Sequence, residues 1–257
     1  MATFGQSFAL PLGAMDINAT AVSLSGTIDK DRMLDRIVVA SYANAATARA
    51  SGVVTSLKVG GQNLLQSDGA SFPVEMIGAN SSDDGAFIGC PLKGGLSCQL
   101  VATMDAVADT GALVFTSDLP AGVSATPDED DYNFIFPMGD TGAIIAGNTW
   151  SLTAIARRNV TLGRVVIVCV SAANTYAVSE TYVDSITIAG SEALSGTGQI
   201  PCFGLPGEST NPFGPHANDD DGLRLDAELT AGESLTISGT STGGVGIGLR
   251  CGVFLED

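Results

Sequence analysis

The one histidine of the chain, His216, lies in a loop that also carries hydroxyl and carboxylate groups. Within residues 207–222, Ser209 and Asp219 could join His216 as a hydrolytic trio, in which the imidazole takes the proton of the serine. Such a nucleophile needs a rigid strand-to-helix turn, and the sequence contains no GxSxG. We therefore expect an exposed loop histidine in a protein that is not an enzyme.

Two acidic runs offer the hard oxygen ligands that calcium prefers. The candidate ligands are Asp128 and Asp130 in the first run, and Asp219 and Asp221 in the second. Neither run has the spacing of an EF-hand loop. The sequence therefore predicts solvated loop carboxylates and no cofactor, with calcium at a domain or subunit boundary as the alternative.

The five cysteines are scattered along the chain, at Cys90, Cys98, Cys169, Cys202 and Cys251. They include no CxxC pair, which a zinc site would favour, and they are odd in number and too sparse for a disulfide scaffold. We expect small buried hydrophobic side chains, in a protein made in a reducing cytoplasm.

The composition is that of short strands and many turns. The 257 residues include 32 glycines, 45% are hydrophobic and only 15% are charged. A surface so poor in charge suits burial against neighbouring molecules. The formal net charge of -17 argues against nucleic acid as the main partner. No apolar run has the length of a membrane span, and the first residues, MATFGQSF, do not predict a secretion signal.

The same sequence pattern occurs twice. The matching blocks are FALPLG (8–13) and FIFPMG (134–139), SLSGTIDKDRMLDRIVV (23–39) and SLTAIARRNVTLGRVVI (151–167), and VTSLKVGGQNLL (54–65) and VDSITIAGSEAL (183–194). Because three blocks recur in one order at a nearly constant separation, we infer an internal duplication.

The duplication predicts the domain organisation. An N-terminal domain is expected over residues 1–120, a linker with prolines and an acidic run over 121–133, and a C-terminal domain over 134–257. The copies differ most at residues 207–222, which match only the shorter segment 79–85.

Each copy shows the two-residue period of β-strands. Val54, Ser56 and Lys58 are expected on one face of a strand and Thr55, Leu57 and Val59 on the other, before a turn at Gly60-Gly61. Further strands are expected at residues 36–40, 96–103, 112–116, 164–170, 233–238 and 245–254. About seven or eight strands in each copy predict an all-β chain of two tandem jelly-roll (β-sandwich or barrel) domains.

Two such domains in one short, glycine-rich chain resemble the double jelly-roll major capsid proteins of tailless icosahedral bacteriophages. The resemblance covers the whole chain and rests on duplication, length and composition. It implies pseudo-hexameric homotrimers that tile the icosahedral lattice of a virion through packed edges rather than an active site. It also implies synthesis in the host cytoplasm, with other virion proteins such as a vertex protein as partners.

Six of the eleven basic residues occupy related places in the two copies. Lys30, Arg32 and Arg36 correspond to Arg158, Val160 and Arg164, and Arg157 lies beside them. If both domains stand in one orientation, these residues form a basic inner face that contacts genome phosphates or the headgroups of an internal membrane. The alternative is inherited surface residues with ordinary ion pairs.

A phage spike, fibre or decoration protein with a receptor- or glycan-binding role is the alternative function. A sugar-binding surface would place several exposed aromatic side chains on one face. Because only 6% of the residues are aromatic, we expect those near the repeat starts, Trp150, Phe134 and Phe136 among them, to fill the cores instead.

Overall fold

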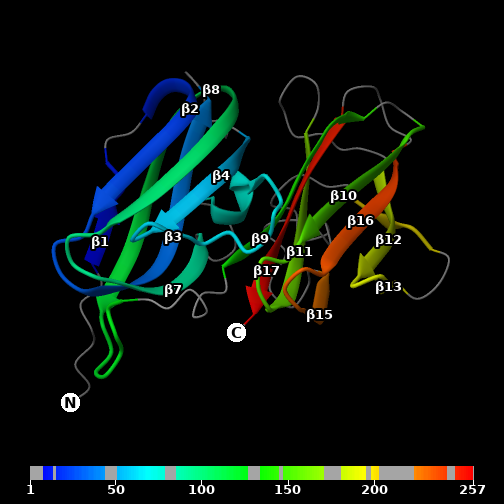
Figure 1. The fold of residues 1–257 in the computed structure, drawn as a ribbon. Coiled ribbons are helices and arrows are strands. Elements are labelled where there is room, and N and C mark those ends of the chain that lie inside the picture. The colour runs from blue at the N-terminus through cyan, green and yellow to red at the C-terminus, as the bar shows by residue number, and fades with distance from the viewer. Residues whose placement is uncertain are drawn as a thin grey trace, which may run out of the picture.

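The computed structural model describes residues 8–13, 16–43, 51–78, 85–126, 134–144, 147–170, 181–194, 198–202, 223–241 and 247–256. These residues form β-strands and one short 3-10 helix, so the all-β prediction is confirmed. Strands β1 to β8 gather on one side of the molecule and β9 to β17 on the other (Figure 1). Within the described ranges, no helix has the length and hydropathy of a membrane span.

The first group of strands is built around one long strand. Its elements are β1 (Phe8–Pro11), β2 (Asp16–Thr27), β3 (Arg32–Ala43), β4 (Gly52–Val59), β5 (Gln62–Asn63), β6 (Phe72–Pro73), the 3-10 helix η1 (Val74–Ile77), β7 (Ala86–Leu92) and β8 (Ser97–Asp118). The first part of β8 pairs with β4 and most of β2, and its second part pairs with β1 and β3. Strand β7 pairs with the other edge of β3.

The predicted break inside β8 is wrong. Separate strands were expected at 96–103 and 112–116, but the chain stays extended between them. Ala108, Asp109 and Thr110 continue the pairing with the end of β3, which keeps their backbone in the sheet.

The second group forms two sheets. Its strands are β9 (Ile135–Ile144), β10 (Thr149–Ile155), β11 (Val160–Val170), β12 (Thr181–Ile188), β13 (Ser191–Glu192), β14 (Ile200–Pro201), β15 (Arg224–Leu229), β16 (Ser234–Ser241) and β17 (Ile247–Glu256). One sheet has the order β15-β11-β17-β9. The other has the order β10-β16-β12-β13, with β14 also paired to β12.

Each strand pairing of the first group has a counterpart in the second. Strand β1 pairs with the end of β8 as β9 pairs with β17, and β3 lies between β7 and β8 as β11 lies between β15 and β17. Strand β4 pairs with β5, β6 and the start of β8 as β12 pairs with β13, β14 and β16. One irregularity also matches: register shifts fall between Val54 and Ser56 in β4 and between Val183 and Ser185 in β12.

The shift in β4 corrects one detail of the predicted alternation. Val54 is buried together with Leu57 and Val59, whereas Thr55, expected on their face, is exposed like Lys58. A β-bulge places one extra residue, Thr55, between two pairs of the ladder, and this reverses the faces on either side of it.

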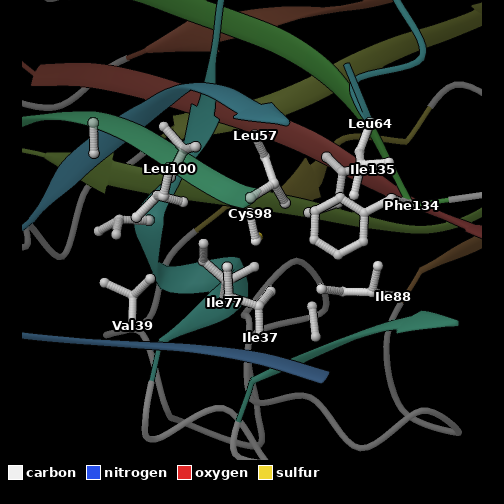
Figure 2. Packing of buried hydrophobic residues seen from close by; sticks show 14 of the residues in the cluster. Ile37, Val39, Leu57, Leu64, Ile77, Ile88, Cys98, Leu100, Phe134 and Ile135 are labelled. Carbon is white, nitrogen blue, oxygen red and sulfur yellow. The ribbon is translucent and has the colours of Figure 1, made fainter. Parts of the chain in front are cut away.

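The hydrophobic residues form two cores, and the first core takes residues from both groups of strands. Phe134, Ile135, Val166 and Val168 of the second group belong to the core of the first. Phe134 and Ile135 lie close to Leu64 (Figure 2). The second core contains Phe136 and Trp150, so the expectation of buried aromatics is confirmed for Phe134, Phe136 and Trp150.

All five cysteines are buried and none forms a disulfide, as expected. Burial raises the pKa of Cys98 to about 12, and the nearby Cys90 adds to the effect. Burial also raises the pKa values of Cys202 and Cys251. These thiols are therefore held in their protonated, weakly reactive form.

Candidate functional site

Two of the six predicted inner-face residues are buried. Arg32 is 3% exposed, and its guanidinium lies 2.5 Å from the carboxylate of Asp118 on the neighbouring strand. The guanidinium carbon of Arg164 lies 5.0 Å from the ring centroid of Phe254, a cation–π contact. These arginines join strands of their own half and do not contribute to an exposed basic surface.

The other four predicted residues lie in three different elements. Lys30 is exposed in the turn after β2, beside the exposed Asp29 and Asp31. Arg157 is exposed and Arg158 is half-buried in the corresponding turn after β10. The fourth residue, Arg36, is half-buried in the middle of β3. A phosphate contact through Lys30, Arg157 and Arg158 stays a prediction.

The predicted calcium ligands and hydrolytic residues lie outside the described residues. These are Asp128, Asp130, Asp219 and Asp221, together with Ser209 and His216. In the part of the chain that the structure describes, no group of three or more His, Cys, Asp or Glu side chains could hold a metal ion. Residues 207–222, expected to differ most between the copies, also lie outside these ranges.

A polar cluster joins the two groups of strands. We call this junction the seam: residues 64–77 of the first group lie against β9, β17 and the turn after β10. The backbone N–H of Gln66 donates to the carbonyl of Ile135 at 3.1 Å, and that of Gly139 donates to the carbonyl of Ser71 at 2.8 Å. The N–H of Arg157 donates to the carbonyl of Gln66 at 2.9 Å.

Side chains extend this ladder. The hydroxyl of Ser67 donates to the carbonyl of Pro137. The carboxylate of Asp68 accepts the N–H of Ile155 at 2.6 Å, and the N–H of Asp68 donates to the carbonyl of Ile155 at 3.0 Å. Segment 64–71 thus satisfies the N–H groups of Gln66 and Asp68 and the carbonyls of Gln66 and Ser71 on the second half.

Beside η1, the two halves also make apolar contacts across the seam. The rings of Phe72 and Phe134 are 6.5 Å apart and nearly perpendicular, a favourable aromatic geometry. Gly252 in β17 faces Met76 and Phe72 so closely that a Cβ atom there would lie 2.6 Å from the sulfur of Met76. The glycine therefore permits the two halves to approach.

Arg250 is the ionic centre of the seam. Its guanidinium donates to both carboxylate oxygens of Asp105, to Asp140 at 3.0 Å and to the hydroxyl of Ser51 at 2.9 Å. Ser51 in turn donates to Glu75 at 2.7 Å. Arg250, Asp140 and the strands β9 and β17 belong to the second half, while Ser51, Glu75 and Asp105 belong to the first.

The charges around Arg250 outweigh its burial. Burial alone would lower the pKa of Arg250, but the hydrogen bonds that it donates to Asp105 and Asp140 and the negative charges of Asp105 and Glu75 raise it above its ordinary value. A permanently charged guanidinium with several hydrogen-bonded carboxylates is the arrangement in which a buried ion is tolerated.

Sequence reasoning missed this residue because Arg250 has no basic counterpart in the first copy. The register places Gly111 at the matching position of β8. A signal was present in the strand itself, since Arg250 interrupts the apolar segment IGLRCGVFLE. A charge inside such a strand is expected to be paired.

Neither a family model nor a curated protein matches the sequence. Among solved structures, the chain is similar to the major capsid protein P2 from Bacteriophage PM2, with 12% identity, 98% of each chain covered and a TM-score of 0.38. It is also similar to PNGF-II, with 10% identity and a TM-score of 0.39, over 98% of this chain and 65% of that one. Scores this low carry no argument about function; the chain is an all-β protein that has a phage major capsid protein among its structural neighbours.

Proposed function

We propose that this chain is a structural protein without enzymatic activity, the major capsid protein of a tailless icosahedral phage. Three chains would form a pseudo-hexameric trimer, and trimers would tile the virion shell. The observation that carries the proposal is the matched strand pairing of the two halves, with a register shift shared by β4 and β12, in units held side by side by the seam. A tile with six similar corners needs this repetition within each chain.

The matched strands support two jelly-roll domains that arose by duplication. In the first half, one set of strands has the order β1-β8-β3-β7 and the other has the order β2-β8-β4-β5. The corresponding orders in the second half are β9-β17-β11-β15 and β10-β16-β12-β13. Two sheets with these orders are what an eight-stranded double Greek key would have, and they support the jelly-roll proposal. The sequence repeats fall on matched strands, which favours domains at 1–120 and 134–257 joined by a linker at 121–133.

The contacts across the seam favour a fixed angle between the two domains. Relative motion is the usual expectation for two domains joined by a small polar interface. Here a backbone ladder, an interlocked apolar contact and the ion cluster of Arg250 act on the same junction. A rigid pair can repeat one geometry around a lattice, which a hinged pair could not do.

The composition supports a protein whose copies pack against one another. With only 15% charged residues, the surface carries few of the solvated side chains that keep a monomer apart from its copies. The net charge of -17 opposes indiscriminate clumping, so association needs matched surfaces. Lys30, Arg157 and Arg158 remain proposed contacts for enclosed phosphates or lipid headgroups.

Light scattering and electron microscopy of the purified full chain test the proposal. We expect a stable trimer or a larger regular assembly at physiological salt. A stable monomer at high concentration would contradict a shell protein. Copy number in the source particle separates the alternatives, because a shell protein is present in hundreds of copies and a spike, fibre or decoration protein of the vertices in tens.

A further inference from the structure

The two halves carry the same sheet face in two different environments. In the second half, we define the covered face as the outer side of β9, β17, β11 and β15. In the first half, we define the open face as the outer side of β1, β8, β3 and β7. The registers relate them position by position: Phe254 matches Phe115, Arg164 matches Arg36, and Arg224 matches Phe87.

The covered face is buried by the first half of the same chain. Val166 and Val168 point away from their own core and belong to the core of the first half. Gly252 lies against Phe72 and Met76, and Phe254 is packed against the same core. The element that covers this face is the docking segment, residues 64–77, which includes β6 and η1.

No described segment of the chain covers the open face, and large apolar side chains on it are exposed to solvent. Phe87 is 64% exposed and Phe115 is 39% exposed, the first being the most exposed large hydrophobic side chain described. Both lie directly opposite Arg36 on the strands that flank β3. Val38 and Leu113 beside them are half-buried. Together these residues form a continuous apolar patch around one guanidinium.

The second half carries the counterpart of the docking segment, and it is also incompletely buried. Ile200 and Pro201 of β14 match Phe72 and Pro73 of β6, because both pairs bind the same positions of β12 and β4. Phe72 and Pro73 are buried in the seam, whereas Ile200 and Pro201 are half-buried. Within the described residues, one chain therefore presents one open face and one half-buried docking element.

We propose that the open face binds β14 and the adjoining residues 198–202 of a second copy of this chain, so that a face and a docking element meet between chains as they do in the seam within one chain. Leu113 stands where the covered face has Gly252, so the two copies lie farther apart than the two halves of one chain. This inference rests on the proposed function and assigns the surface through which copies associate. The contact is heterologous: the face of one chain receives the segment of the next. Because Gly111 stands where the seam has Arg250, the contact between copies is more apolar than the seam.

The test mixes two variants of the full-length chain. The double substitution Phe87→Asp and Phe115→Asp places charges in the apolar patch of the open face and so blocks binding there. Ile200→Asp places a charge in the docking element and blocks its binding to another chain. We expect each variant alone to stay monomeric by sedimentation where the wild-type chain assembles. An equimolar mixture of the two is expected to form dimers that cannot extend, because one intact face meets one intact segment. Val123→Asp, at an exposed site after β8, is the matched control and should assemble like the wild-type chain.

The outcomes distinguish a wrong contact surface from a wrong function. If wild type assembles and both variants also assemble, or if the mixture gives no dimer, the assigned surface is wrong while the shell function stands. If wild type stays monomeric, the proposed function itself fails. Because Ile200 packs on its own core, Pro201→Asp serves as a second variant at the docking element, and urea unfolding confirms that each variant is folded.

Discussion

The guanidinium of Arg250 in β17 binds both carboxylate oxygens of Asp105 in β8, although the two residues lie 145 positions apart in the chain. Their side chains are only 9% and 11% exposed. Removing the cation would leave the buried carboxylates of Asp105 and Glu75 without the positive charge of Arg250. We expect Arg250→Met to lower the free energy of unfolding by about 3–5 kcal/mol, measured by urea denaturation.

An exposed ion pair supplies the control. Arg224 contacts Glu256 and Asp226, and its side chain is 41% exposed. Solvent screens such pairs, so Arg224→Met should cost only about 0–1 kcal/mol. Equal losses for the two variants would show that the seam does not depend on the charge of Arg250.

A substitution at Gly252 tests the apolar contacts of the seam. A Cβ atom at this position would lie 2.6 Å from the sulfur of Met76 and 3.1 Å from the Cβ of Phe72, and both side chains are fully buried. We expect Gly252→Ala to destabilise the fold by about 1–3 kcal/mol in urea denaturation, because the halves must move apart.

The control for this substitution is Gly198→Ala, since a Cβ there would meet nothing within 4 Å. Met76→Ala should offset part of the cost of Gly252→Ala, because it removes the clashing sulfur. Strict additivity of the two changes would mean that the glycine is not needed for the contact.

The turn after β12 predicts a stabilising substitution. Ala189 has a φ of 49°, a left-handed conformation, where the first half has Gly60 at 59°. Alanine pays about 1–2 kcal/mol for this conformation, and glycine loses about 0.5–1 kcal/mol more backbone entropy on folding. Ala189→Gly should therefore raise the free energy of unfolding by about 0.5–1 kcal/mol.

Differential scanning calorimetry would detect this gain as a higher Tm. The reverse change at the neighbouring position, Gly190→Ala, is the comparison, because Gly190 has a φ of 81° and open space around its Cβ. It should lower the Tm. A lower Tm for Ala189→Gly would show that the backbone conformation at Ala189 is not strained.

Period-two patterns and repeat blocks were enough to predict the all-β class and most strands. They place Leu57 and Val59 in the core, and both are buried. They failed at Val54, because a bulge reverses the alternation and no single residue type marks it. They failed again between 103 and 112, where the pairing with β3 keeps β8 continuous.

The candidate site was harder to predict, because it depends on how the two halves meet. Matched basic residues suggested one common face, yet Arg32 and Arg164 turn out to be bound within their own sheets. The strongest ionic site involves Arg250, which breaks the repeat. A repeat pattern reveals what two domains share, whereas their junction depends on positions at which they differ.

Glu192 gives the fold a dependence on acid pH. The hydroxyl of Ser185 and the N–H groups of Leu194 and Ile186 donate to its carboxylate and lower its pKa from the ordinary 4.5. In the first half, Asn63 accepts the matching N–H of Leu65 without a charge. The unfolded chain therefore binds a proton at Glu192 at a higher pH than the folded chain does.

The sign of the effect follows from this order of pKa values. The stabilisation is complete above the ordinary value of 4.5 and is lost as the pH falls through the lower pKa of the folded state. We expect Glu192→Gln to be less stable than wild type in urea at neutral pH and to approach wild type as the solution is acidified. Glu228→Gln, at an exposed carboxylate of β15, is the control and should run parallel to wild type. A constant difference between Glu192→Gln and wild type across the acid range would show that these hydrogen bonds do not favour the charged form.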